Sequence, residues 1–135
     1  MLIAPGEALE GRTLSESSQA LGSRRCSLND IITLQVSKAA RTLHLPEEIP
    51  AILGPPKNEI VVNFPVKMDN GSHLMFTGYR VQHNDILGPY KGGLRYCPEL
   101  TVDDCKGLAL AASCKAALHD IPFGGGMGGI KFDPT

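Results

Sequence analysis

The feature that most constrains the fold is a pair of alternating apolar segments joined by a tight turn. Asp69-Asn70-Gly71 supplies the turn, because Asn and Gly tolerate the positive φ angles of hairpin loops. Apolar side chains recur at every second position on both sides of it, at Ile60, Val62, Phe64, Val66, Met68, Leu74 and Phe76. This pattern predicts an antiparallel β-hairpin. Pro65 has no N–H to donate, so we expect its strand to lie at an edge or to carry a bulge.

One helix is predicted before the hairpin in the chain, and a second helix is predicted after it. The first begins after Ser27 and carries apolar residues at helical spacing as far as Leu43. The second begins after Thr101 in a capping box with Asp in place of Glu or Gln. Its expected packing face is made mostly of small residues: Val102, Cys105, Leu108, Ala109, Ala112 and Ala116. Residues 46–56 and 84–98 are rich in Pro or Gly and are predicted to be connectors, which completes a small α/β domain.

Composition excludes several classes of protein. The 135 residues suffice for one ordinary domain, and the net charge of −1 gives no reason to expect a nucleic acid or an anionic membrane as partner. No apolar run approaches the roughly 20 residues that span a bilayer. The four cysteines and four histidines form no zinc pattern, so we expect no metal and free thiols in a reducing compartment.

The start of the chain is expected to contribute little to the fold. Residues 1–26 mix Ser, Gly, Glu and Leu, without the apolar centre of a secretory signal or the Arg-rich, acid-poor composition of a transit peptide. We interpret them as a poorly ordered lead-in to one domain over residues 27–135. The expected location is cytoplasmic, with a mitochondrial location as the alternative.

A glycine-rich run near the end of the sequence matches the dinucleotide-binding motif, but the elements that normally surround that motif are not predicted here. Gly124 to Gly129 read G-x-G-x-x-G, but a dinucleotide site also needs a helix after the run and an acid about 20 residues further on. We reject that interpretation and expect the glycines to allow close approach of a small ligand.

Two lysines are candidates for an anion site. Lys91 lies within glycine-rich backbone, and Lys115 lies among small residues on the second helix, where we expect a half-buried face. A lysine is usually a solvated surface charge, and a half-buried one needs an anionic partner. The residues alone therefore indicate a possible anion site, and two ammonium groups would suit the two carboxylates of a dicarboxylic amino acid.

Three long strings in this chain resemble the glutamate dehydrogenases of the Glu/Leu/Phe/Val dehydrogenase family. They are residues 65–84, which include Phe76-Thr77-Gly78-Tyr79-Arg80-Val81-Gln82-His83-Asn84; residues 88–96, Gly88 to Tyr96; and residues 120–131, Asp120 to Lys131. The likeness covers about residues 28–135. It implies the amino-terminal dimerisation domain, an α/β (α+β) fold with a mixed sheet flanked by helices and with the Rossmann domain absent.

The resemblance also implies roles for single residues. Lys91 matches the lysine that holds the side-chain carboxylate of glutamate, and Lys115 matches the one that holds the α-carboxylate. Gly92 and Gly93 match backbone that closes on the substrate. Met127 stands at the position of the catalytic lysine, and a thioether neither ionises nor donates a proton.

What the resemblance implies for function is a reaction and a set of partners. The family interconverts L-glutamate with 2-oxoglutarate and ammonia, uses NAD or NADP, and assembles into hexamers. The nucleotide domain and the partner aspartate of the catalytic lysine would lie beyond residue 135. We therefore expect this chain alone to be inactive, with the domain incomplete at its carboxyl end.

Three functions follow from these expectations. The first is the amino-terminal part of a glutamate dehydrogenase. The second is a non-enzymatic truncated paralogue that acts in oligomer assembly or regulation, for example within hexamers of an intact homologue. The third is a stand-alone carboxylate-binding module, which is weaker because half a cleft binds poorly.

Overall fold

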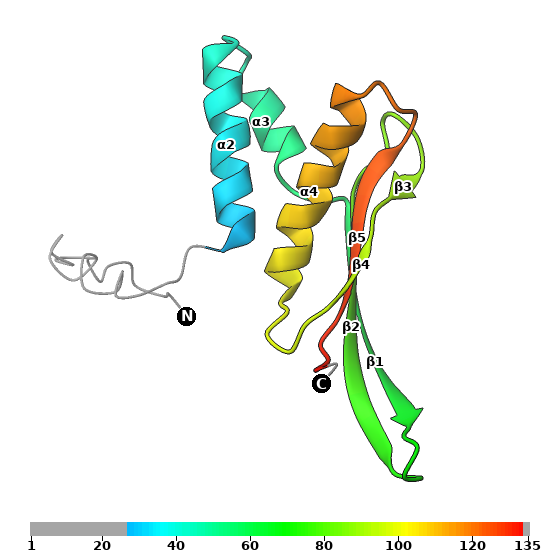
Figure 1. The fold of residues 1–135 in the computed structure, drawn as a ribbon. Helices are drawn as coiled ribbons and strands as arrows, with labels where there is room; N and C mark the ends of the chain where they lie inside the picture. The colour runs from blue at the N-terminus through cyan, green and yellow to red at the C-terminus, as the bar shows by residue number, and fades with distance from the viewer. Residues whose placement is uncertain (1–26, 134–135) are drawn as a thin grey trace, which may run out of the picture.

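The computed structural model describes residues 27–133, in which two helices come first, four strands follow, and a third helix precedes the last strand (Figure 1). The helices are α2 (Leu28–Thr42), α3 (Glu48–Leu53) and α4 (Val102–Leu118). The strands are β1 (Asn58–Lys67), β2 (His73–Asn84), β3 (Tyr90–Lys91), β4 (Leu94–Tyr96) and β5 (Gly124–Ile130). The expected lead-in, residues 1–26, lies outside the described residues.

The five strands form one mixed sheet with β1 at its edge. The order is β1-β2-β5-β3, and β4 pairs with β5 further along the same side. β1 and β2 form the predicted antiparallel hairpin, in which Pro65 pairs with Met75, and the expectation of an edge strand at Pro65 is confirmed. β5 runs antiparallel to β2 and parallel to β3 and β4, so the glycine-rich strand lies in the middle of the sheet.

The helices lie on one side of this sheet, in two tiers (Figure 1). α4 contacts β5 and β2 directly, and α2 packs on α4 rather than on the sheet. Gly107 marks the place where α2 and α4 meet, since a Cβ there would come within 2.9 Å of the carbonyl carbon of Leu28. The other face of the sheet carries no helix within residues 27–133.

Both long helices begin with a capping box, which was predicted for α4, whereas for α2 only a start after Ser27 was predicted. In α2, the hydroxyl of Ser27 accepts a hydrogen bond from the backbone N–H of Asp30 at 3.1 Å, and the Asp30 carboxylate accepts one from the N–H of Ser27. Thr101 and Asp104 form the same reciprocal pair at the start of α4. These bonds satisfy backbone donors that have no partner within the helix, and they fix both starting points.

The core lies between α4 and the sheet. Its buried members are Val81, Leu100, Cys105 and Ala109, and Tyr79, Cys97, Val102 and Met127 pack against them. α4 buries Cys105 and Ala109, as its small-residue face predicted, but also Gly107 and Leu110, because α2 covers a second side of the helix.

Two predicted connectors contain regular structure. Residues 46–56, expected to be a connector, hold α3, which tolerates Pro50 because that proline falls in the first helical turn. Residues 84–98, expected to be a loop, hold β3 and β4, which are only two and three residues long. Neither strand has a sequence pattern of its own, since each forms by pairing with β5. None of the helices in the described residues is long and apolar enough to cross a membrane.

Candidate functional site

A shallow hollow forms where the end of α4 meets β3 and the start of β5. Its volume is about 270 Å³. One face of α4 supplies Ala112, Lys115 and Ala116, and its C-cap residue is His119. The β3 region supplies Lys91 and Gly92, and the segment into β5 supplies Ile121, Phe123 and Gly124. Three of the residues that the sequence selected as substrate-binding therefore line one hollow: Lys91, Gly92 and Lys115.

The hollow is cationic, and its lysines are unpaired. Lys91 and Lys115 form no salt bridge with a carboxylate of the described residues, whereas Lys57 and Lys106 do. The lining itself contains no Asp or Glu. The Lys91 ammonium lies 5.3 Å from the centroid of the Phe123 ring, within the range of a cation–π contact. Both lysines are exposed, so the expectation of a half-buried Lys115 is wrong: the small residues beside it leave its side chain open to solvent.

Gly92 lets the Lys91 segment lie directly on β5. A Cβ at Gly92 would come within 1.4 Å of the backbone oxygen of Gly126, so a side chain there would push the two segments apart. A Cβ at Gly93 would meet only the Met127 sulfur, at 3.9 Å. Gly93 thus lies beside Met127, and neither residue belongs to the lining of the hollow.

Met127 lies in the middle of β5, opposite Val81 of β2. Its side chain is half-buried and packs against the core cluster. It therefore occupies apolar surroundings between the core and the Gly93 backbone. A thioether suits such a position, because it fills irregular apolar space without needing a hydrogen-bond partner.

The glycines of β5 serve packing inside the protein. A Cβ at Gly125 would lie 2.2 Å from the hydroxyl oxygen of Ser113 and 2.4 Å from the backbone oxygen of Ala109, both on α4. A Cβ at Gly129 would lie 2.2 Å from Leu100. At Gly125 and Gly129 the neighbours that need the space are therefore α4 and the core, whereas Gly124 lines the hollow, so that close approach of a ligand stays a prediction there. The run is a strand and not the loop before a helix, in keeping with the rejection of a dinucleotide fingerprint.

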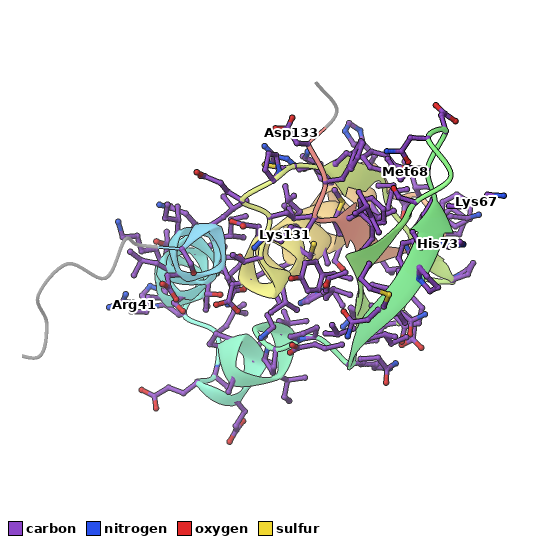
Figure 2. All side chains as sticks on the ribbon, turned by 90° about the horizontal axis from the view of Figure 1, so that it is seen from below. Arg41, Lys67, Met68, His73, Lys131 and Asp133 are labelled. Atoms are coloured by element: carbon purple, nitrogen blue, oxygen red, sulfur yellow. The ribbon has the colours of Figure 1, made fainter. Side chains whose placement is uncertain are left out.

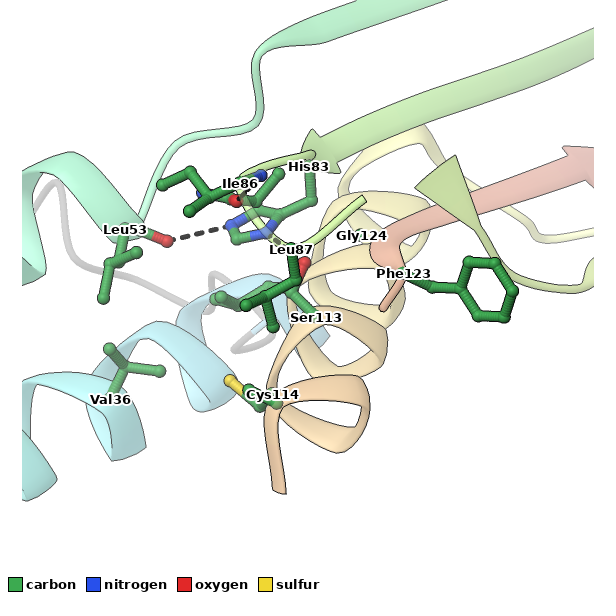
Figure 3. A pocket seen from close by; sticks show the side chains of 12 residues that line it. Val36, Leu53, His83, Ile86, Leu87, Ser113, Cys114, Phe123 and Gly124 are labelled. Atoms are coloured by element: carbon green, nitrogen blue, oxygen red, sulfur yellow. Dashed lines mark hydrogen bonds between the residues drawn. The ribbon is translucent and has the colours of Figure 1, made fainter. Parts of the chain in front are cut away.

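A second hollow of about 210 Å³, lined almost wholly by apolar side chains, lies among α2, α3 and α4 (Figure 3). His83 is buried at its wall, with Nδ1 at 2.7 Å from the hydroxyl of Ser113 and Nε2 at 2.9 Å from the carbonyl oxygen of Leu53. A carbonyl only accepts, so Nε2 carries a hydrogen and the Ser113 hydroxyl donates to Nδ1 when the ring is neutral. Burial lowers the pKa of His83, which favours that neutral form.

Sequence reasoning missed two residues of the cationic hollow. His119 follows Lys115 by four positions on α4, and this spacing alone could have placed both on one helix face. Phe123 has no comparable signal, because its contact with Lys91 depends on how β3 pairs with β5. Among the described residues, no three side chains of His, Cys, Asp or Glu lie close enough together to hold a metal ion. Cys97, Cys105 and Cys114 are free thiols.

Comparison with known proteins agrees with this architecture. Residues 56–135 match the family described as Glu/Leu/Phe/Val dehydrogenase, dimerisation domain. A relative from Thermotoga maritima, named glutamate dehydrogenase, is 45% identical over 108 residues, which cover 80% of this chain and 26% of the relative. The chain thus spans about a quarter of the length of that curated relative.

Solved structures of the same kind share the fold. A glutamate dehydrogenase from Peptoniphilus asaccharolyticus superposes with a TM-score of 0.76 at 34% identity, over 80% of this chain and 27% of that one. A hetero-hexameric glutamate dehydrogenase from Thermus thermophilus, in its Leu-bound form, gives 0.74 at 38% identity, over 79% and 26% of the two chains.

The mixed sheet under a single packed helix, with the matched region, defines the class: an amino-terminal dimerisation domain of an amino-acid dehydrogenase. The chain belongs to the Glu/Leu/Phe/Val dehydrogenase family, and the relatives and structures it resembles are glutamate dehydrogenases.

Proposed function

We propose that the hollow at the end of α4 binds a small dicarboxylate, L-glutamate or 2-oxoglutarate, through Lys91 and Lys115. The observation that carries this proposal is the position of two unpaired ammonium groups, on different elements, in the lining of one hollow without an acid. Lys91 would hold the side-chain carboxylate and Lys115 the α-carboxylate, with the backbone of Gly92 and Gly93 alongside. The names of the relatives support the choice of ligand.

Charge pairing explains why a dicarboxylate fits better than an apolar amino acid. A carboxylate near each ammonium gains a charge-assisted hydrogen bond, and a branched or aromatic side chain would leave Lys91 without a partner. The hollow of about 270 Å³ is open, so part of a bound ligand would remain in water. We therefore expect affinity of about millimolar strength for this chain alone.

For the whole protein we propose the family reaction, which is the NAD- or NADP-linked oxidative deamination of L-glutamate. We expect Met127 to slow this reaction, because it stands at the position of the catalytic lysine. A lysine at position 127 would have an ammonium group able to stabilise charge and move a proton, and methionine has neither ability. The half-buried packing of Met127 against the core explains why the fold accepts this residue. Loss of such a group would cost roughly 10²-fold to 10⁴-fold in rate.

A second candidate, assembly without catalysis, is favoured by a different observation. The uncovered face of the sheet carries exposed apolar residues, among them Ile60, Val62, Leu94 and Tyr96. We propose that this face associates with other subunits, either in a homo-oligomer such as a hexamer or with intact homologues. A chain that keeps this face and the hollow, but has Met127, could act in assembly or regulation.

The binding proposal is tested by titrating the purified 135-residue chain with L-glutamate and following chemical shifts by nuclear magnetic resonance, which detects weak binding. We expect shifts of residues around the hollow, and a loss of affinity of at least about tenfold in Lys91→Met and in Lys115→Met. Lys67→Met is the matched control, because Lys67 lies on the hairpin far from the helices (Figure 2). Unchanged binding in both variants, or no binding by the wild-type chain, would overturn the assignment. Micromolar affinity would instead favour the stand-alone binding module.

A further inference from the structure

The last two turns of α4 direct two nitrogen-bearing side chains to the same hollow. Lys115 and His119 are four positions apart, which places them side by side on one helix face, and both line the hollow. The backbone N–H of His119 donates to the carbonyl of Lys115 at 3.2 Å, so helical geometry continues to His119. The backbone of His119 is thereby fixed at the C-terminal end of α4, where the residue caps the helix.

The side chain of His119 is available to a ligand. Within residues 27–133 its ring makes no hydrogen bond or ion pair, in contrast to the buried ring of His83. The charged groups that share the hollow with it are Lys115 from its own helix and Lys91 from β3. Asp120 follows His119 in the chain, but it does not line the hollow. The other neighbours in the lining are apolar or backbone.

We propose that His119 is a third binding group of this hollow, and that its protonated form strengthens the binding of a dicarboxylate. The inference rests on the proposed function, because it takes the ligand to be the dianion held by Lys91 and Lys115. An ordinary histidine gains its charge as the pH falls from 8 to 5. Between about pH 6 and about pH 8 both carboxylates of 2-oxoglutarate stay almost fully ionised, so a change in affinity over that range comes from the protein and not from the ligand.

The sign of the effect follows from the charges. A bound dianion carries the charge opposite to that of an imidazolium at position 119, so the ligand raises the affinity of the ring for a proton. By linkage, protonation of the ring must raise the affinity for the ligand by the same factor.

The test is a titration of the 135-residue chain with 2-oxoglutarate at about pH 6 and about pH 8, followed by nuclear magnetic resonance. We expect roughly threefold to fivefold tighter binding at the lower pH, as for an exposed charge pair. The ring signal of His119, identified by its loss in His119→Gln, should move when ligand is added. His119→Gln should bind with little dependence on pH.

His73→Gln is the matched control, because His73 lies on the hairpin, far from α4 (Figure 2). It should keep the pH dependence of the wild-type chain. Binding that is equal at the two pH values, or a pH dependence that persists in His119→Gln, would overturn the role of His119 and leave the dicarboxylate site intact. Absence of binding at both pH values in the wild-type chain would instead overturn the proposed function itself, and this inference with it.

Discussion

The two faces of the sheet are built from residues of different size. On the face toward α4, β5 carries Gly125 and Gly129, and the helix residues that lie against β5 and the core include Cys105 and Ala109. Because these residues are small, the backbones of the strand and the helix pack closely and α4 covers this face. On the other face, Phe64 lies 6.2 Å from Phe76, and Phe76 lies 5.5 Å from Phe132, measured between ring centroids. Large apolar groups remain exposed there.

This difference indicates that the closed face stabilises the fold of the domain and that the open face is available for association with other subunits. On the closed face, α4 packs against β5 and β2, and Val81, Cys105 and Ala109 are fully buried between them. The open face has apolar surface of the kind that marks subunit contacts. The cationic hollow lies at the rim of the closed face, where the end of α4 supplies Lys115 and His119.

The largest effect should come from adding one carbon to the closed face. In Gly125→Ala the new Cβ would meet backbone atoms of α4 at 2.4 Å, so the helix must move away from the sheet. We expect a loss of at least about 3 kcal/mol in the free energy of unfolding, measured by chemical denaturation. Gly93→Ala is the matched control, because its Cβ would make only ordinary contacts with Met127. Equal stability of the two variants would contradict the close packing described here.

A smaller effect, on association and not on folding, should come from the open face. Val62 is 48% exposed and lines an apolar hollow of about 420 Å³ on this face, so Val62→Lys should weaken self-association at least about tenfold. Val61→Lys is the control, since Val61 is 54% exposed but points to the opposite side of the same strand. Sedimentation equilibrium measures both. If the two variants associate equally well, the open face is not the subunit contact.

The smallest effect concerns pH and the buried ring of His83. Burial lowers the pKa of this ring in the folded state, so the unfolded chain binds a proton first as the pH falls. The stability that the neutral ring contributes is present above the unfolded pKa of about 6.5 and is lost as the pH falls toward the folded value. One proton limits the slope to about 1.4 kcal/mol per pH unit.

Denaturation curves between about pH 7 and about pH 5 test this dependence, with His83→Gln and His73→Gln compared. The His83 variant should be less stable, because it lacks the hydrogen-bonded ring. It should also lose part of the dependence of stability on pH, because no imidazole is left to titrate at position 83. His73 is exposed on the hairpin, so its variant should keep the wild-type slope. An unchanged slope in the His83 variant would show that other groups produce the pH dependence.

The sequence predicted those parts of the fold that depend on neighbours in the chain. The hairpin followed from the alternation around Asp69-Asn70-Gly71, the start of α2 from the capping residue Ser27, and the start of α4 from its capping box. α3 was missed because its prolines suggested a connector, although Pro50 lies where a helix tolerates it. β3 and β4 were missed because strands of two or three residues are fixed by pairing with β5 and carry no pattern.

Some residues of the candidate site were predicted from the sequence, and others were not. The residues alone indicate Lys91 and Lys115 as a possible anion site, the resemblance to the family adds Gly92, and the structure brings all three into the lining of one hollow. His119 has a helical spacing that would have revealed it. The exposure of Lys115 and the contact of Lys91 with Phe123 depend on how distant segments meet, which local patterns do not encode.

We propose that this chain keeps the binding half of a glutamate dehydrogenase site and that Met127 removes the catalytic group. The most direct measurement joins the chain to the nucleotide domain of an intact homologue and compares glutamate-dependent reduction of NAD or NADP with Met127 and with Met127→Lys. We predict that both fusions fold and assemble, and that the lysine form turns over at least about a hundredfold faster. If both fold and neither turns over, assembly without catalysis becomes the better proposal. If the Met127 form is as active as the lysine form, the assignment of position 127 is wrong.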